Sequence, residues 1–353
     1  MFLQKKTDQP AGKTKLTKTV NLPSQANAAR FSQDGRFLVL GCMDGQIRLI
    51  NDSYEELPPI ALHQGWVQSI DCSSKDESFA SGDSWGALAY HKIQQGNIQK
   101  VWHNPKAHSG WIKKIALSND SSTVASCATD QMIRLFSTKD GSKIREWNHV
   151  SSQPMALCFS PDDKTLVVSD LNGKLDEFVV HSGEKKRSFD ASIFYKLDRI
   201  QDVGGVRSIA FSPDGNLMAC GGCKPSTGGF VQGMTIIKIF DWNSGKELKT
   251  VQGSSDNDGF VHDLRFLNNK ELVAVSSGQP GNGKLFFLKV EENQPYHTVS
   301  NYPNCHAVAV GKDAKKLAIV ATNSNSSGNG KVLDKEKKYP SNFSPVHFLE
   351  LLS

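Results

Sequence analysis

The sequence has no long apolar run. No stretch approaches the roughly 20 apolar residues that a membrane-spanning helix requires, and the first twenty residues contain no apolar core of the kind found in secretory signal peptides. The seven cysteines are odd in number and scattered through strand-like segments, so they do not indicate a secreted disulfide framework. These absences predict a cytoplasmic protein without a membrane span.

An excess of charge of one sign is confined to the first residues. The chain carries a net charge of +5, of which residues 1–20 contribute +4 through five lysines and one aspartate. The rest of the chain has no basic stripe with interleaved aromatic side chains, which argues against a dedicated nucleic-acid binder. We therefore predict a basic flexible tail at residues 1–14 and no specific nucleic-acid partner.

Motifs that would indicate catalysis, a cofactor or a metal site are missing or incomplete. The ten histidines form no His-Glu-x-x-His pair, and no Gly-x-Ser-x-Gly turn is present. Gly278–Lys284 matches the start of a phosphate-binding loop, but Leu285 replaces the required Ser or Thr. Cys220 and Cys223 have the spacing of a metal or redox pair, yet no second pair accompanies them, so we interpret them as small buried residues. We predict no catalytic residue, no cofactor and no metal site.

What the sequence does contain is a repeat. Residues 206–215 read Val-Arg-Ser-Ile-Ala-Phe-Ser-Pro-Asp-Gly, and degraded copies recur at intervals of 41 to 55 residues. The anchor positions of the seven copies are Phe31, Cys72, Leu117, Phe159, Phe211, Phe266 and Val310. Such a period indicates an array of small units, each packed on its neighbours, which allows residues 15–353 to form a single domain.

Each unit alternates short strand-like runs with turn residues. In the third unit, residues 111–117 alternate apolar and polar side chains, residues 119–122 supply a turn, and residues 132–136 form a further strand. Four such strands in a unit of about 40–45 residues favour a propeller over a sandwich or barrel. The predicted fold is therefore all-β: a seven-bladed β-propeller of four-stranded antiparallel blades.

Several short segments resemble the WD-repeat family of β-propellers. They are His-Gln-Gly-Trp-Val at 63–67, His-Ser-Gly-Trp-Ile at 108–112, Phe-Ser-Pro-Asp at 159–162 and 211–214, Ala-Thr-Asp-Gln-Met-Ile-Arg-Leu-Phe at 128–136 and Ile-Phe-Asp-Trp at 239–242. The resemblance spans residues 24–350, although the Trp-Asp pair that closes a repeat of that family is intact in no unit. Several repeats of this chain are therefore degenerate.

The resemblance implies a structural network in the third unit. In that family a His, a Ser or Thr, an Asp and a Trp are hydrogen-bonded within a blade. Here His108, Ser126 and Asp130 match this pattern, and Phe136 stands where the family places Trp. These three have the residue types of a catalytic triad, but the resemblance implies a structural role.

How the ring closes is left open by the sequence. In the family the N-terminal strand often completes the last blade, and residues 16–22 would then pair with residues 346–351. This closure would remove exposed sheet edges, which otherwise invite aggregation. The last unit also contains a long polar insertion, residues 323–344, which makes its strands the hardest to assign.

The resemblance also implies a partner-binding face. In the family, residues that flank the first apolar position of an inner strand point to one face of the disc and often contact partners. By position these are Trp66, Gln68, Trp111, Lys113, Met155, Arg207, Phe260, His262 and His306, and they are joined by Met43 and Thr129, which stand just before the turn Asp residues. Trp and Arg are common among interface hot spots. Packing of Trp66 and Trp111 over the loop of a neighbouring blade is the alternative, and both interpretations stay open.

The predicted function is a non-catalytic scaffold for protein–protein interaction, through one face of the disc. Its partners would be other proteins or peptides, and the chain would act as a monomer or as a subunit of a larger complex. The alternative is a propeller enzyme of the metal-dependent hydrolase or lactonase type, with polar residues converging on the central channel. Inner-strand residues are mostly Ala, Ser, Cys and Val, which favours the scaffold.

Overall fold

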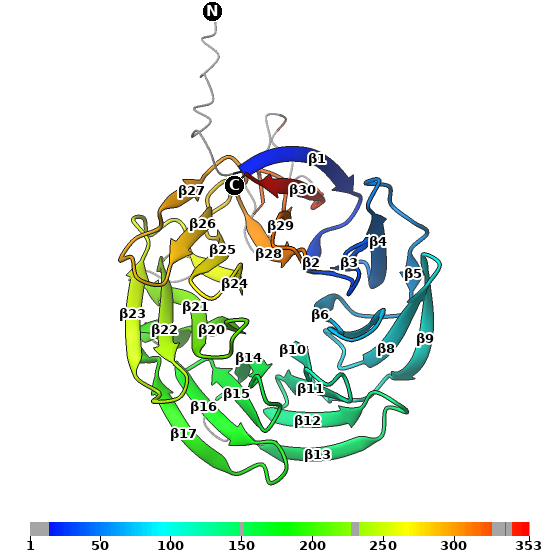
Figure 1. The fold of residues 1–353 in the computed structure, drawn as a ribbon, viewed down its shortest axis with the longest axis horizontal. Helices are drawn as coiled ribbons and strands as arrows, with labels where there is room; N and C mark the ends of the chain where they lie inside the picture. Colours follow the sequence, from blue (N-terminus) through cyan, green and yellow to red (C-terminus); the bar gives the residue numbers. More distant parts are fainter. Residues whose placement is uncertain are drawn as a thin grey trace, which may run out of the picture.

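Seven four-stranded antiparallel sheets stand as blades around a central axis in the computed structural model (Figure 1). The structure describes residues 14–148, 152–198, 200–226, 233–326, 336 and 341–352. The predicted all-β, seven-bladed propeller is confirmed. No helix in the described part of the chain is long and apolar enough to cross a membrane.

Within each blade, the four strands are arranged side by side from the central axis to the outer edge. The inner strands are β2 (Ala26–Phe31), β6 (Val67–Cys72), β10 (Ile112–Leu117), β14 (Pro154–Phe159), β20 (Val206–Phe211), β24 (Phe260–Phe266) and β28 (Cys305–Val310). The second strands are β3 (Phe37–Cys42), β7 (Ser78–Asp83), β11 (Thr123–Ala128), β15 (Thr165–Asp170), β21 (Leu217–Pro225), β25 (Glu271–Ser277) and β29 (Lys316–Ala321). The third strands are β4 (Gln46–Asn51), β8 (Leu88–Gln94), β12 (Met132–Ser137), β16 (Lys174–Val179), β22 (Gly233–Asp241), β26 (Leu285–Lys289) and β30 (Ser344–Leu351). The outer strands are β5 (Ile60–Ala61), β9 (Asn97–Asn104), β13 (Lys143–Asn148), β17 (Lys185–Asp190), β23 (Glu247–Gln252), β27 (His297–Val299) and β1 (Thr14–Leu22). Every anchor position of the repeat is the last residue of an inner strand.

The N-terminal strand closes the ring. β1 pairs antiparallel with β30, with Val20 opposite Val346 and Leu22 opposite Ser344, so the last blade combines the two ends of the described chain (Figure 1). This is the closure considered from the sequence. The predicted basic tail lies outside the described residues apart from Thr14, where β1 begins, and most of the polar insertion does as well.

Small residues allow neighbouring blades to approach closely. A Cβ atom added at Gly82 would lie 2.8 Å from Cγ2 of Ile112 in the next blade, and one added at Gly221 would lie 2.6 Å from Cγ1 of Val261. Both distances are shorter than real Cβ contacts, so a larger residue would force the blades apart. The close packing of the inner strands fixes the width of the central channel.

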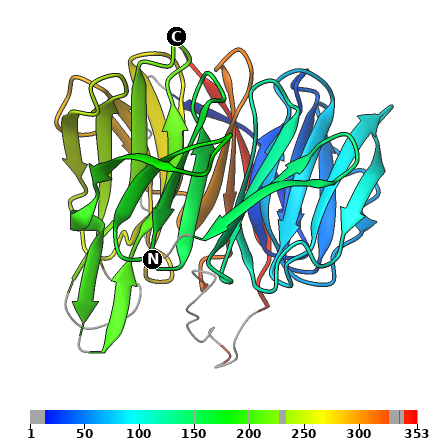
Figure 2. The ribbon, with the colours of Figure 1, turned by 90° about the horizontal axis from the view of Figure 1, so that it is seen from below.

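The two longest intervals of the repeat have a structural cause in the fifth blade. A short helix η1 (Ser192–Phe194) and a hairpin of β18 (Tyr195–Asp198) and β19 (Gln201–Gly204) precede β20, and the β21–β22 hairpin is extended. Green strands of this region extend past one flat face of the disc at the lower left of Figure 2, which shows the disc edge-on. Phe194 is buried against the blade and holds the insertion in place.

Candidate functional site

Each inner strand contains a β-bulge at the same position. The pairing register between the first and second strands skips one residue in every blade, four positions before the anchor. A bulge leaves one residue unpaired and re-aims its side chain. The seven bulged residues, which we call the mouth ring, are Asn27, Gln68, Lys113, Met155, Arg207, His262 and His306. All seven are partly exposed and line one cavity at the mouth of the central channel.

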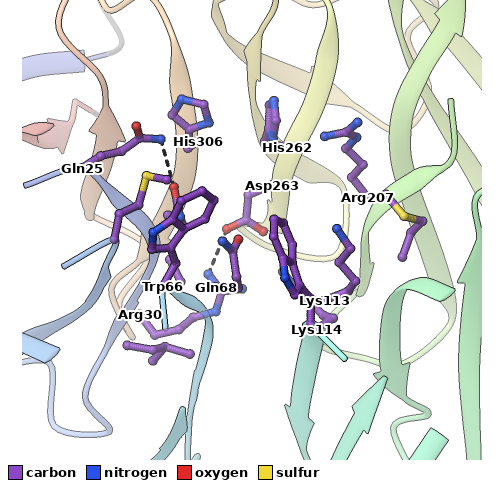
Figure 3. A pocket seen from close by; sticks show the side chains of 16 residues that line it. Gln25, Arg30, Trp66, Gln68, Lys113, Lys114, Arg207, His262, Asp263 and His306 are labelled. Carbon is purple, nitrogen blue, oxygen red and sulfur yellow. Dashed lines mark hydrogen bonds and ion pairs between the residues drawn. The ribbon is translucent and has the colours of Figure 1, made fainter. Parts of the chain in front are cut away.

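This cavity has a volume of about 390 Å³ and gathers most of the predicted face (Figure 3). Nine of the eleven predicted residues line it: Met43, Trp66, Gln68, Trp111, Lys113, Met155, Arg207, His262 and His306. Gln25, Asn27 and Ala28 complete its upper wall, and Arg30, Lys114 and Asp263 lie among the residues below. A volume near 400 Å³ lies within the range of ligand-binding pockets.

The other two predicted residues support the cavity without lining it. Phe260 is buried, and its ring lies under the guanidinium of Arg207, 3.7 Å from the guanidinium carbon. Thr129 accepts a hydrogen bond from the backbone N–H of Trp111 through its Oγ1 atom at 2.9 Å. Both residues therefore position neighbours that reach the cavity.

The two tryptophans of the face are exposed. Trp66 and Trp111 are 41% and 42% exposed, and their rings meet edge to face with centroids 5.6 Å apart. Each backbone N–H is held by a hydroxyl at 2.9 Å, that of Trp66 by Ser84 and that of Trp111 by Thr129. Each ring therefore contacts a neighbouring blade and still exposes part of its surface at the mouth.

The mouth ring contains two cations without carboxylate partners. No carboxylate in the described part of the chain lies within ion-pair distance of Lys113 or Arg207. The Lys113 ammonium lies 5.0 Å from the ring centre of Trp111 instead. Burial, followed by the proximity of Arg207, lowers the pKa of Lys113, and burial lowers the pKa of Arg207. The mouth therefore holds positive charge that no carboxylate of the described residues pairs with.

Two histidines extend this polar side of the mouth. His262 and His306 meet edge to face with ring centroids 4.9 Å apart. Burial, then the neighbouring His306 and Arg207, lowers the pKa of His262 well below its ordinary value. His262 is accordingly neutral at physiological pH and offers a hydrogen-bonding surface beside Arg207.

A second group of charges lies deeper in the channel, and we call Arg30, Asp71, Lys114 and Asp263 the inner belt. Arg30 bridges two blades, with Nη1 2.9 Å from Oδ2 of Asp263 and Nε 3.5 Å from Oδ1 of Asp71 (Figure 3). Burial opposes the charge on Arg30, but Asp263 and Asp71 raise its pKa. Burial lowers the pKa of Lys114, while the same two carboxylates favour its charged form. Arg265 Nη2 also lies 3.3 Å from Oδ1 of Asp263, so the two carboxylates of the belt are shared among three cations.

Asp263 connects two further strands, β20 and β28, to this belt. Its Oδ1 atom accepts a hydrogen bond from Ser208 Oγ at 3.2 Å, and its Oδ2 atom accepts one from the backbone N–H of Val308 at 3.3 Å. The carboxylate is almost fully buried, with 3% of its side chain exposed. The inner belt is therefore a structural crosslink between blades. Sequence reasoning missed it because most other inner-strand residues are small.

The predicted network in the third unit is present as a hydrogen-bonded cluster. His108 Nε2 lies 2.8 Å from Ser126 Oγ, and His108 Nδ1 lies 3.0 Å from Asp130 Oδ1. Arg134 adds an ion pair to Asp130 at 2.7 Å. Burial opposes ionisation of Asp130, but hydrogen bonds from His108 and Arg134 keep its pKa well below the ordinary value. Ser126 is fully buried, which favours a structural role for the cluster over a catalytic one.

A second such network, not found from the sequence, lies in the second unit. His63 Nδ1 donates to Asp83 Oδ2 at 3.0 Å, and His63 Nε2 lies 2.7 Å from Ser81 Oγ. His91 takes the strand position that Phe136 holds in the next blade, and its Nε2 atom lies 2.9 Å from the same hydroxyl. Because a carboxylate only accepts, Ser81 donates to His63 and His91 donates to Ser81. The signal was the spacing from His to Ser, 18 residues in both units.

The remaining motifs serve the fold. Lys284 ends a turn between β25 and β26 and forms an ion pair with Asp258 at 2.7 Å. Cys220 and Cys223 lie buried in one strand, and burial raises the pKa of both thiols to about 12, which keeps them protonated. The described residues contain no group of three or more His, Cys, Asp or Glu side chains placed to hold a metal ion.

Comparison with known proteins identifies similar sequences. The family model described as "WD domain, G-beta repeat" matches residues 15–51, 99–137 and 200–226. Apoptotic protease-activating factor 1 of Rattus norvegicus is 23% identical over 66% of this chain, and the WD repeat-containing protein 91 homolog of Dictyostelium discoideum is 21% identical over 49%. Eukaryotic translation initiation factor 3 subunit I of Drosophila yakuba is 26% identical over 63%. The matches cover 18%, 23% and 70% of these relatives' own lengths, respectively.

Proposed function

The chain is a degenerate WD-repeat β-propeller with seven blades, and from this we propose that it is a non-catalytic scaffold that captures a protein partner at the channel mouth. The observation that carries the proposal is the cavity lined by one bulged residue from each blade and flanked by Trp66 and Trp111. Exposed tryptophans beside a concave, partly polar surface have the composition of an interface hot spot.

The rigidity of the site supports this proposal. The mouth ring stands on seven inner strands whose packing leaves no space for a Cβ at Gly82 or Gly221. Hydroxyl groups fix the backbone of both exposed tryptophans. A pre-organised surface loses little conformational freedom on binding, so more of its contact energy appears as affinity.

Similar proteins support a role within an assembly. One relative is named as a subunit of a translation initiation factor, and the match covers 70% of its length. We therefore propose that this chain, too, works as a component of a multi-protein complex, and that it does so in the cytoplasm. Its buried, unpaired thiols suit a reducing compartment.

The experiment is affinity capture from cell extract with a double variant, Trp66→Ala with Trp111→Ala. The matched control is Ile144→Ala with Leu248→Ala, two exposed apolar side chains on outer strands. We expect the tryptophan variant to have the same thermal unfolding midpoint as wild type. It should nevertheless lose the proteins that co-purify with wild type, whereas the control variant should retain them. Unchanged recovery of every co-purifying protein by the folded tryptophan variant would exclude the mouth as the capture surface.

A further inference from the structure

We propose that the mouth cavity recognises an acidic side chain of the partner, seated between Lys113 and Arg207, with an adjacent apolar residue against Trp66 and Trp111. This inference rests on the proposed function and specifies the chemistry of the captured segment. The anionic group is a carboxylate or a phosphate carried on a protein chain.

The distribution of charge along the channel carries the argument. Below the mouth, Arg30 pairs with Asp71 and Asp263, and Arg265 pairs with Asp263. The same two carboxylates favour the charged form of Lys114, although it forms no ion pair with a described residue. In the mouth ring one layer above, two cations have no carboxylate of the described chain within ion-pair distance. An anionic ligand therefore meets cations without a described carboxylate partner at the mouth, whereas the cations below it share two carboxylates.

The arrangement of the two cations is suited to a shared anion. Lys113 and Arg207 belong to the third and fifth blades, with Met155 of the fourth blade between them in the ring. The aliphatic part of each side chain is partly buried, and an aromatic ring lies near each charged group. Arg207 Nε is buried and makes no hydrogen bond to any described residue. Buried donors without a partner are costly, and an entering carboxylate or phosphate would satisfy this one.

The mutual effect of the cations supports the same conclusion. Burial lowers the pKa of both groups, and the charge of Arg207 lowers the pKa of Lys113 further. An anion placed between two like charges relieves their repulsion as well as neutralising each one. Few other ligand groups gain from both effects.

The surroundings favour an anion carried on a protein segment. Trp66 and Trp111 present exposed aromatic surface directly beside Lys113, which a free inorganic anion would not use. A nucleic acid would require basic side chains extended along its backbone, whereas the chain beyond residue 20 carries a net charge of only +1. An acidic residue next to Phe or Leu matches both parts of the mouth.

The test uses three pools of fluorescein-labelled twelve-residue peptides. Each pool has a fixed central residue, flanked by Phe or Leu and otherwise mixed uncharged residues, and the centre is Glu, phosphoserine or Gln. Binding to the full chain is followed by fluorescence anisotropy. We expect the Glu pool, the phosphoserine pool or both to bind at least about tenfold more tightly than the Gln pool, since charge-assisted hydrogen bonds exceed neutral ones by that order. The tighter of the two anionic pools identifies the source of the anion.

The variants show where the preference originates. Lys113→Met with Arg207→Met keeps the aliphatic stems and should remove the preference, and each single substitution should reduce it partly. Lys164→Met, whose side chain is 80% exposed and pairs with Asp162, is the matched control and should leave the preference intact. Equal binding of all three pools by wild type, or a preference that survives in the double variant, would overturn the inference. If the tryptophan variant loses its partners while the three pools bind equally, the scaffold proposal stands and only the acidic specificity fails.

Discussion

The mouth ring and the inner belt are neighbouring layers of one channel, but they differ in whether their cations have carboxylate partners among the described residues. Lys113 and Lys114 are adjacent in sequence, as are His262 and Asp263, and the bulge directs both members of each pair toward the axis. In the belt, Asp263 pairs directly with arginine side chains, and hydrogen bonds cross between blades. In the ring, cations stand without counter-charges of the described chain. Charge compensation thus distinguishes polar residues that hold the fold from those available to a ligand.

The largest expected effect is the removal of Asp263 from the inner belt. Asp263→Ala leaves Arg30 without its closest counter-charge and deprives Ser208 and the Val308 N–H of an acceptor. Breaking one partner of a buried ion pair costs about 3–5 kcal/mol. We expect a loss of that size in the free energy of unfolding measured with urea.

A surface pair provides the control for this variant. Glu292 pairs with Lys289 at 3.3 Å, and both side chains are more than a third exposed. Exposed ion pairs contribute about 0–1 kcal/mol, so Glu292→Ala should have little effect. A similar cost for the two substitutions would show that the belt does not stabilise the ring.

A second, smaller effect concerns a buried base outside the channel. His91 is fully buried, and burial, followed by the charges of His63, His103 and Lys100, lowers its pKa to about 3. The unfolded chain binds this proton near pH 6.5, whereas the folded protein resists it. Stability from this group is therefore complete above pH 6.5 and decreases as the pH falls toward 3. At pH 5 the loss is about 2 kcal/mol.

Urea unfolding of wild type and His91→Phe between pH 7 and pH 4 measures this effect. Phe keeps the stacking on Phe79, whose ring lies 4.6 Å from that of His91, but cannot be protonated. The variant loses a hydrogen bond to Ser81 at every pH, and its stability should decrease less steeply with acid. Parallel pH profiles for the two proteins would show that His91 is not the titrating group.

The fold could be predicted because its determinants are local and repeated. Each anchor ends an inner strand, and in five of the seven units a turn with the same backbone hydrogen bond follows it, as from Gly215 N–H to the Ser212 carbonyl. Six of the seven mouth-ring residues were predicted for the same reason: one position of the unit enters the channel in every blade. Asn27 was missed, and from the first unit only Met43, which stands just before the turn residue Asp44, was predicted. Met43 does line the cavity, although it is not a bulged residue.

The inner belt could not be predicted because its contacts are not local. Arg30 and Asp263 are 233 residues apart and belong to blades that are not adjacent. The repeat fixes the position of each side chain within its own blade, but it contains no information about which charges meet across the axis. The second histidine network was missed for a different reason. Its Asp83 stands two positions before the place of Asp130, where Trp85 occurs instead.

The smallest expected effect is the change in the free energy of unfolding when the two mouth cations are removed. It tests whether these cations, unlike Asp263 of the inner belt, contribute little to stability. Lys113→Met with Arg207→Met removes two partly buried charges that no described carboxylate compensates, and it keeps the stems that pack on Trp111 and Phe260. Since burying an unpaired charge is unfavourable, the free energy of unfolding should stay within about 1 kcal/mol of wild type and shift toward higher stability. Urea unfolding at pH 7 measures the difference. Residues that serve to bind a ligand contribute little to the stability of the unliganded fold. A loss of stability comparable to that of Asp263→Ala would therefore show that Lys113 and Arg207 have a structural role.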